Sequence, residues 1–129
     1  AFRYYRELIE RTGSPATLDT GHILSYQWLR GKQDNFLEGL EDLPYEHCFE
    51  IHLSGCQIIG GKFMDFHHGI LLDEQLELLQ FLIDRCPNLK VITYEDPKFT
   101  PDGRLIEKSV ANYERLRGIA HQWVKEVTR

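Results

Sequence analysis

Six side chains of the kinds that bind transition metals stand near the ends of three short β-like segments of this chain. Three are carboxylates and three are imidazoles. Neutral imidazoles supply nitrogen donors and carboxylates neutralise charge, a combination that suits a borderline or hard ion such as Fe, Mn or Zn. The pattern predicts a metal centre without thiolate ligands. Its candidate ligands are Asp19, His22, His52, Asp65, His67 and Glu95.

The number and spacing of these ligands indicate more than one ion. Six ligands exceed the four that a tetrahedral zinc site takes, so two or more metals that share carboxylates explain the set better. Asp19 and His22 are three residues apart, and Asp65 and His67 are two apart. We expect each pair to turn toward one centre from a loop.

Two further polar residues lie close to these ligands in the sequence. Glu50 alternates with His52 and should face the same side of a strand, where it either hydrogen-bonds to a ligand or forms a buried structural pair. His68 follows His67. It is open to three interpretations: a hydrogen-bonding partner of a ligand, a ligand in place of His67, or an exposed neighbour.

The elements that must position these residues alternate along the chain. Apolar residues at three- and four-residue spacing predict helices over 1–12, 23–40 with a break at Gly31, 73–86 and 106–127. Short β-branched and aromatic runs predict strands over 16–19, 48–54 and 89–94, with a loop over 55–69. Strands that alternate with helices are typical of an α/β fold with a parallel sheet. The carboxyl ends of such strands meet at one edge, where functional groups gather.

The ligand spacing and local text resemble a known group of proteins. The array is similar to that of the xylose-isomerase-like TIM-barrel superfamily, and within it to the multinuclear non-haem iron-dependent oxidative enzymes, the MNIO family. The resemblance spans roughly residues 15 to 100. The pieces that carry it are Leu18-Asp19-Thr20-Gly21-His22, Glu50-Ile51-His52-Leu53-Ser54-Gly55, Asp65-Phe66-His67-His68-Gly69, Pro87-Asn88-Leu89 and Tyr94-Glu95-Asp96-Pro97.

This resemblance implies a function as well as a fold. It implies a TIM-like (β/α) barrel with two or three iron ions at its C-terminal mouth, held by the six candidate ligands. Family members use iron with dioxygen to oxidise cysteine residues in ribosomally made peptides, commonly with a partner protein that presents the peptide. Zinc and manganese are the alternative metals.

The length of the chain limits the fold. Its 129 residues are about half of the roughly 250 of a complete barrel, and it starts without methionine. We therefore expect residues 1–129 to form a single partial barrel domain, the C-terminal half, completed by an N-terminal half or by an oligomer partner. Two departures from the family accompany this: Cys56 stands where a histidine is common, and the family's additional His and Glu ligands have no counterpart.

Other functions are compatible with the same residues. Within the superfamily, the zinc-dependent apurinic endonucleases resemble this chain equally in ligand spacing. A divalent-metal sugar isomerase is a further alternative, although the catalytic lysine pattern of that group is not evident in the sequence. A truncated, non-catalytic fragment or interaction module is the alternative from outside the enzymes, because the isolated chain is expected to be incomplete as a catalyst.

Composition narrows the partners and the compartment. The net charge of −5 and the absence of a basic cluster argue against a nucleic-acid partner. No apolar run approaches the roughly 20 residues of a membrane span. Three cysteines at spacings that match neither a disulfide framework nor a metal motif predict a reducing, cytoplasmic location.

Overall fold

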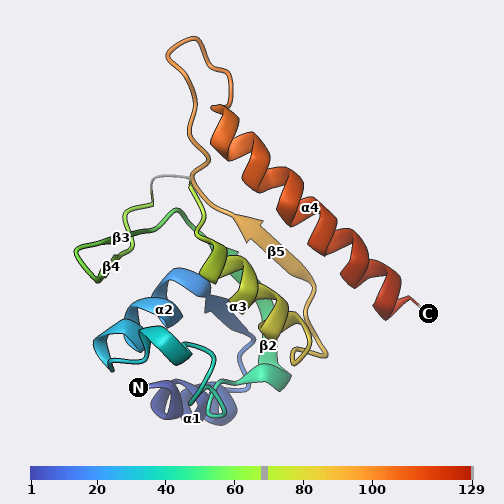
Figure 1. Cartoon of the computed structure of the whole chain (residues 1–129). Coiled ribbons are helices and arrows are strands. Elements are labelled where there is room, and N and C mark those ends of the chain that lie inside the picture. Colours follow the sequence, from blue (N-terminus) through green and yellow to red (C-terminus); the bar gives the residue numbers. More distant parts are fainter. Residues whose placement is uncertain (68–69, 129) are drawn as a thin grey trace.

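A three-stranded parallel sheet forms the centre of the molecule. The computed structural model describes residues 1–67 and 70–128. The strands β1 (Ala16–Asp19), β2 (Cys48–Leu53) and β5 (Val91–Tyr94) lie in the order β1-β2-β5, and both neighbouring pairs are parallel (Figure 1). Asp19 pairs with His52, and His52 with Thr93, so the three carboxyl ends are level. The predicted parallel α/β arrangement is confirmed.

Helices connect and flank these strands in the predicted order. They are α1 (Phe2–Thr12), α2 (Thr20–Leu29), α3 (Asp73–Ile83) and α4 (Glu107–Val127). Two short 3-10 turns, Gln33–Asn35 and Tyr45–His47, lie between α2 and β2. None of the described helices combines the length and the apolar character needed to cross a lipid bilayer.

The prediction of a broken helix over 23–40 is wrong in its second half. α2 ends at Leu29, and Gly31 then reverses the chain with a φ of 72°. The buried Gln27 side chain holds the following segment in its non-helical path, because its amide nitrogen donates to the Phe36 and Glu38 carbonyls at 2.8 and 2.7 Å. This tertiary contact overrides the local helical pattern.

A β-hairpin occupies part of the segment that was expected to be a loop. Strands β3 (Gln57–Ile59) and β4 (Lys62–Met64) pair antiparallel and extend away from the main sheet (Figure 1). Gly60 and Gly61 both have positive φ, 56° and 77°, which a two-residue hairpin turn requires. A hydrogen bond of 3.0 Å from the Cys56 amide to the Ile70 carbonyl closes the base of this excursion. The hairpin thus returns the chain to the edge of the sheet.

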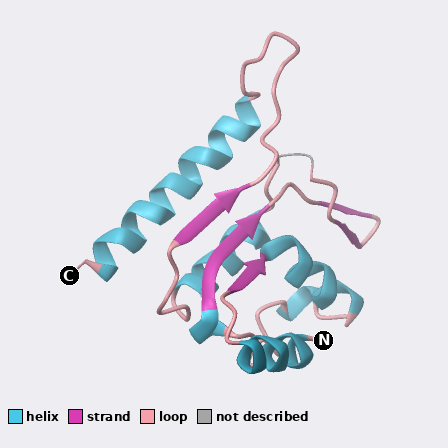
Figure 2. Cartoon of the chain, turned by 180° about the vertical axis from the view of Figure 1, so that it is seen from behind, coloured by secondary structure: helices cyan, strands magenta, loops and turns pink. Residues whose placement is uncertain are grey.

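The two faces of the main sheet differ in chemistry. One face carries Leu18, Ile51 and Leu53, which are at most 2% exposed and belong to the hydrophobic core. Helices α2 and α3 lie on that side, so Figure 2, seen from behind, shows the strands in front of them. The other face carries a polar row in which Thr17 and Thr93 donate to the two carboxylate oxygens of Glu50 at 3.5 and 2.6 Å.

Helix α4 packs only in part against the rest of the molecule. Leu116 is buried in the core, and Ser109 and Asn112 are buried beside it. The predicted apolar stripe is otherwise poorly covered, since Val110, Tyr113 and Val127 are exposed. Three parallel strands do not close a barrel over the described residues.

A buried glutamine ties together the segments that carry the sheet edge. The Gln75 amide nitrogen donates to the Ser54 carbonyl at 2.8 Å and to the Thr20 hydroxyl at 3.2 Å, and its oxygen accepts from the Leu72 amide at 2.9 Å. Thr20 in turn donates to the His52 carbonyl at 3.2 Å. The starts of α2 and α3 are therefore fixed to the end of β2.

We expect Gln75→Leu to lower the free energy of unfolding by about 1–3 kcal/mol, because it leaves the Ser54 carbonyl and the Leu72 amide buried without these partners. Urea denaturation followed by circular dichroism measures the change. The exposed Gln80 on the same helix provides the control, and Gln80→Leu should change stability by less than about 0.5 kcal/mol. Equal stability of the two variants would contradict the role of Gln75.

Candidate metal centre

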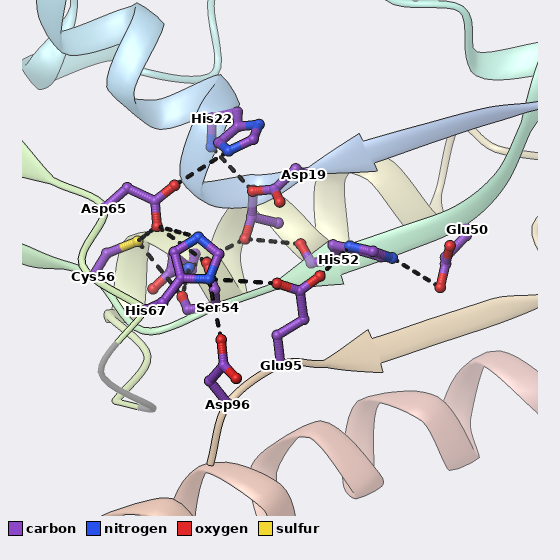
Figure 3. Close-up of polar contacts among 12 residues, drawn as sticks. Asp19, His22, Glu50, His52, Ser54, Cys56, Asp65, His67, Glu95 and Asp96 are labelled. Carbon is purple, nitrogen blue, oxygen red and sulfur yellow. Dashed lines mark hydrogen bonds and ion pairs between the residues drawn. The ribbon is translucent and has the colours of Figure 1, made fainter. Parts of the chain in front are cut away.

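The carboxyl ends of the three parallel strands bring three predicted ligands together. Asp19 ends β1, His52 lies near the end of β2 and Glu95 follows β5. Each offers one ligand atom, and these atoms lie within 4.8 Å of one another. Figure 3 shows the three side chains pointing into one space from their separate strands. We call Asp19, His52 and Glu95 the strand-end triad.

The other three predicted ligands form a second group. His22, Asp65 and His67 also place one ligand atom each within 4.8 Å of one another, and we call them the loop triad. The Asp65 carboxylate lies between the two rings, 3.4 Å from His22 Nε2 and 3.5 Å from His67 Nε2. The β3–β4 hairpin returns the chain so that Asp65 and His67 reach this position (Figure 3).

The structure places Asp19 and His22 in different groups, whereas Asp65 and His67 lie in the same group. Asp19 is the residue before α2, and its carboxylate accepts a hydrogen bond of 3.1 Å from the His22 amide. Such capping fixes the carboxylate at the start of the helix. The His22 ring, on the first turn of α2, contacts Asp65 instead. The helix start therefore divides this pair between the two triads.

Asp96 is a neighbouring acid that the predicted ligand set lacked. It lies 3.2 Å from His67 Nδ1 and forms a third possible ligand group with His67 and Glu95. His67 and Asp96 are the non-glycine residues with positive φ among those described, at 53° and 51°. Such backbone conformations cluster at functional sites. The signal for Asp96 in the sequence was its position directly after Glu95.

The predicted role of His68 beside the ligands concerns a residue that lies outside the described residues.

The two triads are in direct contact with each other. His67 Nδ1 of the loop triad lies 3.6 Å from the Glu95 carboxylate of the strand-end triad. Glu95 therefore lies between the two groups, where its carboxylate could contribute to the binding of an ion in either one. The exposure differs across the cluster: the His22 side chain is 70% exposed and that of Asp65 14%. The cluster is thus open to solvent on the side of α2.

Asp65 is held by short polar side chains from the end of β2. The Ser54 hydroxyl donates to its Oδ1 at 3.1 Å, and the Cys56 thiol donates to the same oxygen at 3.5 Å. Burial, together with the negative charge of Asp65, raises the pKa of the Cys56 thiol. The thiol therefore keeps its proton and acts as a donor at neutral pH.

Glu50 fixes the ring of His52 from the side opposite to the triad. Its carboxylate lies 2.9 Å from His52 Nε2, while His52 Nδ1 faces Glu95. The hydrogen bond from Thr93, followed by that from His52, lowers the pKa of Glu50. An ionised Glu50 can accept a hydrogen bond from Nε2, and Nδ1 would then be available to an ion at the triad. A carboxylate behind a ligating histidine is a common feature of metal sites.

Negative charge accumulates at this edge of the sheet without basic residues to balance it. The ion pairs of the described residues give Asp19, Asp65, Glu95 and Asp96 no lysine or arginine partner. The hydrogen bond with Asp96, reinforced by the nearby acids, raises the pKa of His67. Carboxylates held this close repel one another unless a cation or a proton lies between them.

Comparison with known proteins does not assign this arrangement. No protein-family model matches the sequence, and no curated protein matches it.

Gly21 lies where α2 closely approaches Asp65. A Cβ at this position would lie 3.1 Å from both the Asp65 carboxylate and Cys56 Sγ. We expect Gly21→Ala to lower cobalt affinity measured by isothermal titration, because the added methyl shifts a ligand. Gly118→Ala is the control, since its Cβ would meet open space; it should keep the affinity and gain about 0.5–1 kcal/mol of stability. Unchanged cobalt affinity in Gly21→Ala would show that the close approach of α2 to Asp65 does not control the metal site.

We expect Glu50→Gln to weaken metal binding by about 10- to 100-fold, because the amide is a poorer acceptor for the His52 proton. Competition with a chromogenic chelator measures this change. Glu77→Gln on the exposed side of α3 is a matched control for the loss of one negative charge. Equal metal affinities of the two variants would mean that Glu50 only accepts the hydrogen bonds from Thr17 and Thr93 on the sheet and does not support metal binding.

Proposed function

We propose that the strand-end triad and the loop triad bind a cluster of two or three iron ions that oxidises cysteine residues in a ribosomally made peptide. The convergence of three imidazoles and three carboxylates, in two touching groups at one sheet edge, is the observation that carries this proposal. The donor set fits iron, since it combines nitrogen and oxygen ligands without thiolate. The resemblance to MNIO enzymes in these same residues supports the oxidation of cysteine residues as the proposed reaction.

The residues at this site would have different roles in binding and orienting the metal ions. The strand-end triad would hold one ion and the loop triad a second, with Glu95 and His67 at the contact between them. When bound, the iron ions supply redox chemistry with dioxygen. Glu50 would accept a hydrogen bond from His52 Nε2 and so orient the ring, and Ser54 and Cys56 orient Asp65 by donating to its Oδ1. The exposed side at His22 gives a peptide access.

We further propose that the sheet belongs to a (β/α) barrel of the TIM type, of which this chain forms the C-terminal half. A parallel sheet is normally covered on both faces, yet here the polar face lies opposite to α2 and α3 (Figure 2). That face fits the interior of a barrel. An N-terminal half or a second copy would then supply further strands, and a partner protein would present the peptide.

The metal content of the chain tests this proposal. After anaerobic reconstitution with ferrous iron, we expect about two equivalents of bound iron by elemental analysis. His52→Ala and Asp65→Ala each remove a ligand from one triad, so each should lose at least about one equivalent. His121→Ala, on the exposed surface of α4, should keep the full content.

Two results would overturn the proposal. Iron content that is equal in His52→Ala, Asp65→Ala and His121→Ala would place the metal elsewhere. Selective binding of zinc over iron in the protein as purified would favour the endonuclease-like alternative.

A further inference from the structure

Two cysteines that lie far apart in the sequence meet in the hydrophobic core. Cys48 begins β2 and Cys86 follows α3, and both belong to the core cluster, with exposed fractions of 0% and 4%. Both are free thiols, and the Cys86 side chain is hydrogen-bonded to the Cys48 sulfur. Their spacing in the sequence gives no sign of this pair, because the packing of α3 on β2 creates it.

Polar contacts outside the thiols hold the two chain segments together. The Asn88 side-chain amide donates to the Glu46 carbonyl at 2.7 Å, and the Lys90 backbone amide donates to the Phe49 carbonyl at 2.9 Å. Glu46 and Phe49 stand on either side of Cys48 in the sequence. The two sulfurs are therefore kept close by neighbours that do not depend on the oxidation state of either thiol.

The two thiols differ in how readily they lose a proton. The hydrogen bond from Cys86 lowers the pKa of Cys48, whereas the same contact, together with burial, raises the pKa of Cys86. Cys48 is thus the sulfur that ionises first, and Cys86 keeps its proton as the donor. Thiolates rather than thiols react with peroxides, so the pair has one nucleophile and one resolving partner.

Cys86 is also the member of the pair that lies nearer to solvent. It forms part of the wall of a pocket of about 460 Å³ at the ends of α3 and α4, beside Trp123 and Val127. Hydrogen peroxide is little larger than water and carries no charge. It can therefore approach the sulfurs from this pocket without unfolding of the core.

We propose that Cys48 and Cys86 are a redox modification site, at which hydrogen peroxide forms a disulfide that a thiol reductant opens again. The Cys48 thiolate attacks one peroxide oxygen and becomes a sulfenic acid, and the other oxygen takes up a proton and leaves as water. The Cys86 sulfur then attacks the sulfenic sulfur, and its thiol proton leaves with the hydroxyl as a second water. Two thiols are oxidised by two electrons, and one peroxide is reduced.

This disulfide would fasten α3 to β2 at both of its ends. Gln75, near the start of α3, already holds the Ser54 carbonyl after β2, and the new bond would join the other end of α3 to the start of β2. A cross-link between distant residues stabilises a protein mainly by restricting its unfolded chain. The bond would lie at the opposite end of the strand from the candidate ligands, which end or follow the strands.

Counting thiols before and after oxidation tests the proposal on the full, metal-free chain. The reduced protein is treated with hydrogen peroxide in the presence of a chelator, then unfolded and alkylated. We expect one alkylated cysteine instead of three, and recovery of all three after dithiothreitol. Before alkylation, the oxidised chain should weigh about 2 Da less than the reduced chain.

Peptide mapping identifies the two sulfurs. Digestion with trypsin and Glu-C cleaves after Glu50 and so separates Cys48 from Cys56. The cross-linked product should join residues 47–50 to residues 86–90. In urea, the oxidised chain should have an unfolding midpoint that is higher by about 1 M or more than that of the reduced chain.

Variants of each cysteine provide the controls. Cys48→Ala and Cys86→Ala should form no disulfide within the chain under the same treatment. Cys56→Ala is the matched control, since the Cys56 thiol donates to Asp65 rather than to another sulfur; it should still lose both of its remaining thiols. Circular dichroism verifies that each variant is folded, and the measurements on the unaltered chain need no variant.

Several outcomes would overturn the proposal. Three alkylated cysteines after peroxide treatment would show that the folded pair does not react, as would oxidation that occurs only in urea. A cross-link through Cys56, or a disulfide-linked dimer on a non-reducing gel, would assign the bond elsewhere. An unfolding midpoint that is unchanged or lower after oxidation would mean that the fold does not accommodate the bond. Because the experiment uses no metal, its failure leaves the proposed iron cluster untouched.

Discussion

Repulsion among carboxylates that meet at one sheet edge is the constraint on which the rest of this structure depends. Level parallel strands place Asp19 and Glu95 in one group with His52, and the hairpin adds Asp65 beside them. Such an arrangement is costly unless positive charge enters it. The imidazoles can accept protons, as the raised pKa of His67 indicates. A metal ion would provide more positive charge in the same volume, which is why we propose an ion site here.

The fold separates stability from chemistry by giving each face of the sheet a different role. The leucines and isoleucines of one face form the core with α2 and α3. The other face carries hydroxyls, carboxylates and His52, linked by hydrogen bonds. Gln75 connects the two, because it is buried on the core side and yet holds the backbone at the end of β2. The candidate ligands are thus positioned by a packed layer on the opposite face of the sheet.

The sequence predicted those features that follow from strand topology. Alternating strands and helices imply that strand ends share an edge, so the strand-end triad could be foreseen without coordinates. The division of Asp19 from His22 depends on capping geometry, which spacing alone does not reveal. Asp96 joins the cluster through a left-handed backbone that the sequence does not specify. The β3–β4 hairpin was predicted as a loop, although Gly60 and Gly61 were a signal for a tight turn. The end of α2 depends on a tertiary contact of the buried Gln27.

The hydroxyl of Tyr5 closes the free edge of β1 and connects that edge to α1. It occupies both the amide and the carbonyl of Thr17, which are the groups that a new strand on this edge of β1 would need. A strand that pairs there has to displace Tyr5, which belongs to α1. Because Asp19 ends this same strand, extension of the sheet and the geometry of the strand-end triad are coupled through one side chain.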